Sequence, residues 1–198
     1  MNIDASNLEK KLIEWSVNNS GYDEHRDYIG LSTLADCSRI IYHRYFNRVG
    51  LAREGHLKTR YCYEVEENIK ERFRRMGLYS PEKEISIFDG LVKGHTDGEI
   101  LGYLLEIKTV PETDHIPRCS VYIPGKVYWQ VQAYMLYGSY NRAFLIYLAR
   151  KFGLFRVFIV TRDESLQSKI NIRVNDLVEA VRRRKIPACE CGKCEKKG

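Results

Sequence analysis

The segment Tyr103–Val110, with the sequence YLLEIKTV, constrains the fold more than any other part of the chain. Its apolar residues indicate a strand that is largely buried. Side chains alternate along a strand, so Glu106 and Lys108 share one face while Leu105 and Ile107 share the other. A carboxylate is almost never fully buried unless another group compensates its charge. The segment therefore predicts a core strand that carries a functional site on one face.

The bulk composition predicts one domain. A chain of 198 residues suits a single compact domain over residues 1–198, and 44% hydrophobic residues suffice for a core. No apolar run approaches the length of a membrane span, and the first residues do not resemble a signal peptide. We therefore expect a cytoplasmic protein without membrane association. The formal net charge of +6 is weak evidence for a polyanionic partner.

Hydrophobic periodicity and turn residues predict the order of the elements. Helical spacing is expected over residues 6–18, from about residue 32 to Gly50, and over residues 58–76, 126–138 and 165–185. Strands are expected over residues 84–88, 90–97, 103–110, 143–150 and 154–161. This order predicts an α/β fold in which a mixed central β-sheet is flanked by helices.

The strands 90–97 and 103–110 are expected to pair as a hairpin, with Asp97 near its turn. Adjacent strands lie about 5 Å apart, so Asp97 and Glu106 are expected to converge on one point. Mg²⁺ or Mn²⁺ prefers oxygen ligands such as these carboxylates, and the cation would offset their repulsion. Lys108 could then orient a metal-associated water or stabilise charge on a phosphate. The structural alternative is an exposed hairpin edge with an ion pair.

The spacing of these charges resembles the PD-(D/E)xK nuclease superfamily. Thr96 stands in place of the proline, Asp97 follows it, and Glu106, Ile107 and Lys108 come after eight intervening residues. The resemblance implies a restriction-endonuclease-like core. It also implies hydrolysis of phosphodiester bonds with Mg²⁺ or Mn²⁺.

A second motif lies in the helix expected over residues 126–138. Gln130 and Tyr134 are four residues apart and therefore project from one helical face. Q-x-x-x-Y at this distance after E-x-K resembles the RecB-type branch of the superfamily. There the two side chains are thought to position the substrate or the catalytic lysine, and the bland alternative is a core tyrosine beside a solvated glutamine.

The superfamily also places an acidic or histidine metal ligand on the helix before the sheet. Candidates in YCYEVEENI are Glu64, Glu66 and Glu67, of which Glu66 fits best. The resemblance thus implies a metal site made by Glu66, Asp97, Glu106 and the backbone carbonyl of Ile107.

Six cysteines in a chain without an export signal argue against a disulfide framework, and those crowded at the end favour a metal. The segment around Cys37, S-x-x-x-x-C-x-R-x-x-Y, resembles the start of iron–sulfur nucleases of the AddB type and of CRISPR adaptation. The resemblance implies a [4Fe–4S] cluster on Cys37, Cys189, Cys191 and Cys194. The tail reads C-x-C-x₂-C, which departs from the usual spacing and leaves structural Zn²⁺ as the alternative. Residues 1–57 and 187–198 would form this cluster-binding part.

The resemblance as a whole implies a metal-dependent DNA nuclease. An exonuclease acting on single-stranded DNA is favoured, in recombination, repair or CRISPR spacer acquisition, with proteins of those pathways as possible partners. Arg39, Arg44 and Arg48 are candidate phosphate contacts. The alternatives are a non-catalytic DNA-binding module of a larger helicase–nuclease complex and a zinc-stabilised interaction protein. Cutting polarity, strand preference and oligomeric state remain open.

Overall fold

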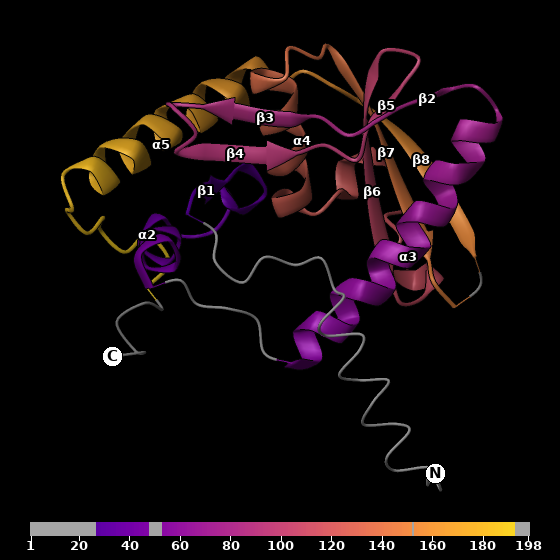
Figure 1. The fold of residues 1–198 in the computed structure, drawn as a ribbon, viewed down its shortest axis with the longest axis horizontal. Helices are drawn as coiled ribbons and strands as arrows, with labels where there is room; N and C mark the ends of the chain where they lie inside the picture. Colours follow the sequence, from indigo (N-terminus) through magenta and orange to yellow (C-terminus); the bar gives the residue numbers. More distant parts are fainter. Residues whose placement is uncertain (1–26, 48–52, 152, 193–198) are drawn as a thin grey trace, which may run out of the picture.

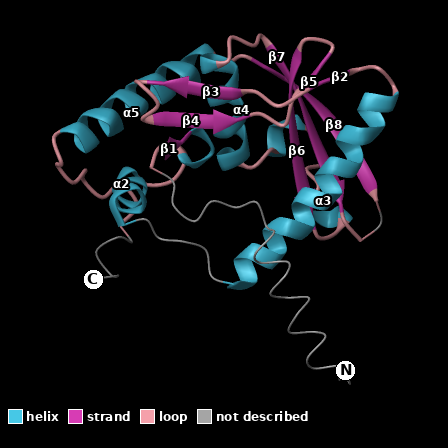
Figure 2. Cartoon of the chain, viewed as in Figure 1, coloured by secondary structure: helices cyan, strands magenta, loops and turns pink. Residues whose placement is uncertain are grey.

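The computed structural model describes residues 27–47, 53–151 and 153–192, and its strands form two sheets (Figures 1 and 2). One sheet has the order β1-β4-β3, with β1 at Ile29–Gly30, β4 at Val92–His95 and β3 at Glu84–Ile87. The other has the order β2-β5-β6-β7-β8, with strands at Tyr79–Ser80, Glu99–Ile100, Tyr103–Val110, Arg142–Ala149 and Leu154–Thr161. The predicted helix over residues 6–18 lies outside the described residues.

In the part of the chain that the structure describes, four helices flank the sheets. They are α2 (Ser38–Asn47), α3 (Arg53–Arg75), α4 (Gly125–Tyr137) and α5 (Glu164–Arg182), and short 3₁₀ turns occupy Leu31–Thr33, Thr113–His115 and Ser120–Tyr122. The five-stranded sheet is mixed, because β6 and β7 are parallel and its other neighbours are antiparallel. The α4 helix supplies the crossover that a parallel pair requires. The predicted α/β class is therefore confirmed. Among the described residues, no helix is both long and apolar enough to span a bilayer.

The five-stranded sheet separates two apolar clusters, as Figure 1 shows for the helices on either side. On one face α4 packs against β6 and β7 in the cluster that contains Leu104 and Leu145, and α5 packs against α4. On the other face α3 packs through Ile69 against Leu105 and Ile107. The strand β6 is apolar on both faces because helices cover both sides of it. This burial positions Glu106 and Lys108 in the interior.

The predicted hairpin of strands 90–97 and 103–110 is wrong. The strand β4 pairs with β1 and β3 in the three-stranded sheet, whereas β6 pairs with β5 and β7. The chain leaves one sheet at Thr96 and enters the other at Glu99 through Gly98, whose φ is +119°. A Cβ on Gly98 would lie 2.5 Å from the Tyr79 ring, so only glycine fits this crossing. Asp97 therefore lies at the junction of the two sheets.

Candidate active site

Glu106 is the centre of the candidate site. Its side chain is only 2% exposed, and its Oε1 atom accepts hydrogen bonds from Lys108 Nζ at 2.5 Å and from Gln130 Nε2 at 2.9 Å. Its second oxygen, Oε2, is buried and has no hydrogen-bond partner among the described residues. A buried carboxylate oxygen without a donor is costly, which makes this atom the strongest indication that the residues here suit a cation.

Asp97 faces the same strand from the junction of the sheets. Its Oδ2 atom accepts a hydrogen bond from the backbone N–H of Ile107 at 2.6 Å. The N–H and C=O of one strand residue point to the same side, so the Ile107 carbonyl also points toward Asp97. Thr96, at the position of the motif's proline, is buried, and its Oγ1 accepts from the backbone N–H of Lys83 at 3.0 Å. Asp97 is thus fixed from both sides, although β4 and β6 are not paired.

The two residues of the Q-x-x-x-Y pattern are adjacent on α4, with Gln130 Nε2 lying 3.4 Å from the Tyr134 hydroxyl oxygen. Tyr134 is 3% exposed and packs against the backbone of β4 at Gly94. A Cβ on Gly94 would lie 2.5 Å from the Tyr134 ring. Gly94 therefore permits the close approach that holds Tyr134, and Gln130 beside it reaches Glu106.

Among the three candidate glutamates of α3, Glu66 faces the other carboxylates. Its pKa is raised to about 8, mainly by burial and then by the charges of Asp97 and Glu106, while Lys108 and Lys70 lower it. Glu67 instead forms ion pairs with Lys70 and Arg74, and Glu64 is exposed. The geometry singles out Glu66, which stays a proposal as a ligand.

The carboxylates of the site resist ionisation when no cation is present. The pKa of Glu106 is raised to about 7, because burial and the charge of Asp97 together outweigh the lowering effect of Lys108. Burial likewise raises the pKa of Asp97. The pKa of Lys108 is raised, because the attraction of Glu106 and Asp97 outweighs the opposing effect of burial. The site therefore holds more negative charge than its surroundings stabilise.

The donor set fits a hard divalent cation. It comprises one backbone carbonyl and three carboxylates, and one of these carboxylates, that of Glu106, has a buried oxygen without a hydrogen-bond partner among the described residues. Mg²⁺ and Mn²⁺ prefer such oxygen ligands, whereas no thiol or imidazole belongs to this set.

Sequence reasoning missed Lys70, whose side chain is 2% exposed beside this site. Its Nζ atom lies 2.5 Å from Glu82 Oε1 and 3.0 Å from Glu67 Oε1. The only signal in the sequence is a lysine directly after the inward-facing Ile69, and such lysines usually reach solvent. Here Lys70 joins α3 to the segment between β2 and β3, and its charge opposes the rise in the pKa of Asp97.

Three of the four predicted cluster cysteines come together. The sulfur atoms of Cys37, Cys189 and Cys191 lie within 4.8 Å of one another, close enough to share a metal ion. Cys37 is buried at the start of α2, and the other two lie in the segment after α5, which returns to α2 (Figure 1). Cys194 lies outside the described residues. Cys62 and Cys119 do not belong to this group.

The segment that carries Cys189 and Cys191 is held by side chains. Glu190, between the two cysteines, accepts a hydrogen bond from Ser38 Oγ at 2.8 Å and pairs with Arg173 of α5. Arg39 Nε donates to the Pro187 carbonyl at 3.0 Å. No local pattern predicts this arrangement, because Ser38 and Glu190 are 152 positions apart in the chain.

The three arginines proposed as phosphate contacts are placed differently from one another. Arg39 is engaged with Pro187, and Arg44 pairs with Asp36 at 2.7 Å while its side chain stays 54% exposed. Arg48 lies outside the described residues. Only Arg44 is therefore seen to offer an exposed guanidinium.

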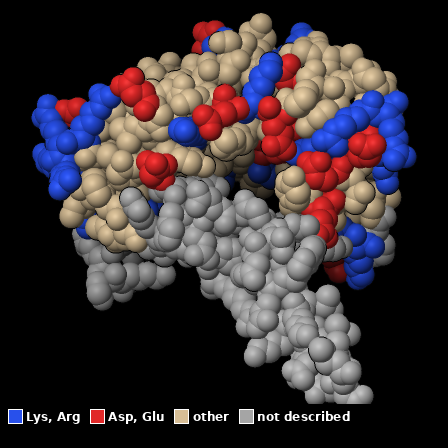
Figure 3. Space-filling view, in the orientation of Figure 1, with Lys and Arg blue, Asp and Glu red and all other residues tan. Residues whose placement is uncertain are grey.

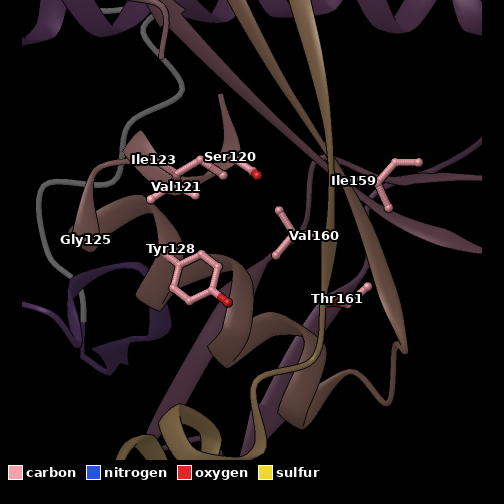
Figure 4. Close-up of a pocket in the computed structure, with 8 residues that line it drawn as sticks. All are labelled: Ser120, Val121, Ile123, Gly125, Tyr128, Ile159, Val160 and Thr161. Atoms are coloured by element: carbon pink, nitrogen blue, oxygen red, sulfur yellow. The ribbon is translucent and has the colours of Figure 1, made fainter. Parts of the chain in front are cut away.

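The surface shows a hollow beside α3, and a separate cavity lies beside β8. Figure 3 shows a hollow between α3 and the three-stranded sheet, with acidic and basic side chains gathered beside it. A separate cavity of about 370 Å³ lies between the loop before α4 and strand β8, where Val160 points into it and Ile159 points away (Figure 4). Tyr128 is its only titratable lining residue; the others are Ser120, Val121, Ile123, Gly125, Ile159, Val160 and Thr161. That cavity offers no acid–base pair or metal ligands, so the carboxylates around Glu106 stay the candidate site.

Comparison with known proteins gives structural matches only. No protein-family model matches the sequence, and no curated protein matches it significantly. The structure of LHK-Exo in complex with dAMP is similar, with a TM-score of 0.63 and 14% identity over 92% of this chain and 97% of that one. The alkaline exonuclease LHK-Exo from Laribacter hongkongensis gives 0.58 and 15% over 87% and 93%. The protein SSO0001 gives 0.59 and 14% over 96% and 92%. The chain therefore has the fold of these proteins, a restriction-endonuclease-like core.

Proposed function

We propose that this chain is a DNA nuclease that requires Mg²⁺ or Mn²⁺. The observation that carries the proposal is Glu106, a buried carboxylate paired with Lys108 on one oxygen and unpartnered on the other. A purely structural strand gains nothing from this arrangement, whereas a metal-dependent hydrolase needs it. The fold shared with an alkaline exonuclease supports the proposal, and so does the spacing of Asp97, Glu106 and Lys108.

Each residue has a role in this proposal. Glu66, Asp97, Glu106 and the Ile107 carbonyl hold the cation, which supplies a Lewis acid for the phosphate oxygens. Lys108 orients the attacking water or stabilises the charge on the phosphate. Hydrolysis adds this water across a P–O bond, leaving a phosphate on one product and a hydroxyl on the other.

The remaining site residues act on geometry and binding. Gln130 and Tyr134 position Glu106 and the DNA, and Gln130 already donates to Glu106. Arg44, whose side chain is exposed, contacts DNA phosphates, and Arg39 and Arg48 are further candidates for such contacts. Action as an exonuclease on single-stranded DNA is the preferred form. A role in recombination, repair or CRISPR spacer acquisition follows from the sequence resemblance.

The cysteines form a second metal site within a single domain over residues 1–198. Four thiolates from Cys37, Cys189, Cys191 and Cys194 would hold a [4Fe–4S] cluster, and tetrahedral Zn²⁺ is the alternative. The three described sulfur atoms, within 4.8 Å of one another, support metal binding without choosing between the two. Anaerobic purification separates them, because an iron–sulfur protein is brown and a zinc protein is colourless.

The decisive experiment is a nuclease assay on labelled single- and double-stranded DNA with Mg²⁺, Mn²⁺ or EDTA. Wild type is compared with Glu106→Ala and Lys108→Ala, and Glu179→Ala, an exposed residue of α5, is the control. We expect metal-dependent cutting by wild type and by the control, and none by the two site variants. If wild type binds DNA but does not cut, the chain is a DNA-binding module instead. If it neither binds nor cuts DNA, a zinc-stabilised interaction protein is the better description.

A further inference from the structure

Tyr147 is a buried residue with an unexplained hydroxyl. Tyr147 lies on β7 and is 2% exposed. Its hydroxyl has no hydrogen-bond partner among the described residues. Its ring packs edge to face on Phe158, with the ring centroids 6.0 Å apart. Packing explains the ring but not the hydroxyl, because a phenylalanine would fill the same space without burying an unpaired polar group.

The register of the sheet places this hydroxyl beside the candidate site. Tyr147 is the Cα partner of Lys108 in the parallel pair of β6 and β7, so both side chains project from the same face. Neighbouring strands are about 4.8 Å apart, and the two side chains have similar lengths, so their polar ends lie at a similar height. Burial raises the pKa of Tyr147 to about 12, with Lys108 opposing and Glu106 adding to the rise. The hydroxyl is therefore protonated at neutral pH, and it interacts electrostatically with both Lys108 and Glu106.

A cation at the site changes what Lys108 can bond. Without it, the Lys108 ammonium lies 2.5 Å from Glu106 Oε1. A cation held by Glu106 would compete for that carboxylate and repel the ammonium. Lys108 is largely enclosed, with 29% of its side chain exposed, so it needs another acceptor nearby. The oxygen of Tyr147 is an acceptor on the adjacent strand that no described residue uses.

We propose that Tyr147 is a positioning residue that accepts a hydrogen bond from the Lys108 ammonium when a divalent cation occupies Glu106. Its own O–H remains available to donate to an oxygen in the site. When the Lys108 ammonium exchanges its hydrogen bond to Glu106 for one to Tyr147, Glu106 becomes free for the cation and Lys108 is directed toward the phosphate. The proposal rests on the nuclease function for its kinetic consequence, but its effect on cation binding does not require cutting.

The test is Tyr147→Phe, which removes only the oxygen. Turnover of a short single-stranded DNA should fall on the order of 10-fold, the value of one hydrogen bond to a charged group, with KM within about twofold. Binding of Mn²⁺ to the DNA-free protein, measured by titration calorimetry, should weaken several-fold because Lys108 stays on Glu106. The melting temperature in EDTA should stay the same or rise, because an unpaired buried hydroxyl is lost.

A matched control and a double variant make the test specific. Tyr137→Phe removes a hydroxyl from α4 that lies 3.2 Å from Asn171 Oδ1, and it should leave turnover and Mn²⁺ affinity unchanged. Lys108→Ala should strengthen Mn²⁺ binding by removing the competing ammonium. Adding Tyr147→Phe to Lys108→Ala should then have no further effect, because the hydroxyl acts through the lysine.

The outcomes separate this inference from the proposed function. Unchanged turnover and Mn²⁺ affinity in Tyr147→Phe, with wild type cutting DNA, would overturn the role of Tyr147 and leave the nuclease intact. A lower melting temperature with unchanged Mn²⁺ affinity would show that the hydroxyl is structural. If wild type does not cut, the Mn²⁺ titrations of the single and double variants still decide the matter.

Discussion

Replacing Glu106 by glutamine should stabilise the metal-free protein while removing its response to metal. Glutamine has the shape of a protonated glutamate and can keep one oxygen facing Lys108. The pKa of Glu106 is raised from 4.5 to about 7, so ionisation is harder in the folded protein than in the unfolded chain. At about 1.4 kcal/mol per pKa unit, the charge costs the folded state about 3 kcal/mol above pH 7. For a chain of this size, that amounts to roughly 6–12 °C in melting temperature.

The raised pKa of Glu106 also predicts how the stability difference between wild type and Glu106→Gln changes with pH. Between pH 4.5 and about 7 the folded protein holds a proton on Glu106 that the unfolded chain has lost. The contribution of Glu106 to the free energy of unfolding therefore falls as the pH rises through this window. Below pH 4.5 both states are protonated, so wild type and Glu106→Gln should be equally stable. The advantage of the variant should grow across the window and reach its full size above about pH 7.

Thermal unfolding in EDTA and in Mn²⁺, from pH 4 to 8.5, tests this reasoning. Wild type should gain about 3 kcal/mol from Mn²⁺ at 100 times the dissociation constant, and Glu106→Gln should gain much less. Lys83→Gln, which neutralises an exposed charge paired with Glu99, is the control for a change of charge alone. A variant that is less stable than wild type in EDTA at pH 8 would refute the argument. An equal gain from Mn²⁺ in both proteins would show that the cation binds elsewhere.

Further predictions concern the rest of the site. Because the pKa of Glu66 is about 8, Mn²⁺ binding should release protons and strengthen up to about tenfold per pH unit and per proton between pH 6 and 8. Calorimetry in buffers of different ionisation enthalpy measures that release; a pH-independent affinity would exclude Glu66. Gly94→Ala should force the Tyr134 ring away, costing about 1–3 kcal/mol in urea unfolding and lowering turnover. Glu190→Ala should lower the iron or zinc content per protein, measured by elemental analysis, because Glu190 holds the cysteine segment through Ser38 and Arg173. Glu179→Ala should leave that content unchanged. Equal metal content in the two variants would show that Glu190 does not hold the cysteine segment in place.

The sequence could predict the strand β6 and the charges on it, because a period of two is a local property of the chain. The spacing of Gln130 and Tyr134 on α4 is equally local. The path by which the chain brings Asp97 to the site is not a local property, because it depends on the pairing of β4 with β1 and β3 rather than with β6. The crossing between two sheets still brings Asp97 to β6, where it accepts a hydrogen bond from the backbone N–H of Ile107, although the predicted hairpin is wrong.

Residues that act at long range left the weakest signals. The contact between Ser38 and Glu190 spans 152 positions, and no periodicity points to it. Lys70 looks like an ordinary surface lysine until β2 and the segment after it fold over α3. Gly94 reads as a weak point in a strand, and its reason emerges only from the ring of Tyr134 against it. In each case the information lies in a second element that the local pattern does not name.

The position of the charges within β6 explains why the fold tolerates them. Leu104, Leu105 and Ile107 of this strand are at most 2% exposed, and burying each contributes about 1.5–3 kcal/mol. This gain exceeds the roughly 3 kcal/mol that Glu106 costs when ionised, so one strand can carry both a core and a strained site. A loop could not do this, because it lacks the apolar neighbours that fix the carboxylate in place. A strand anchored by buried apolar residues is therefore a place where Glu106 can remain available to a cation.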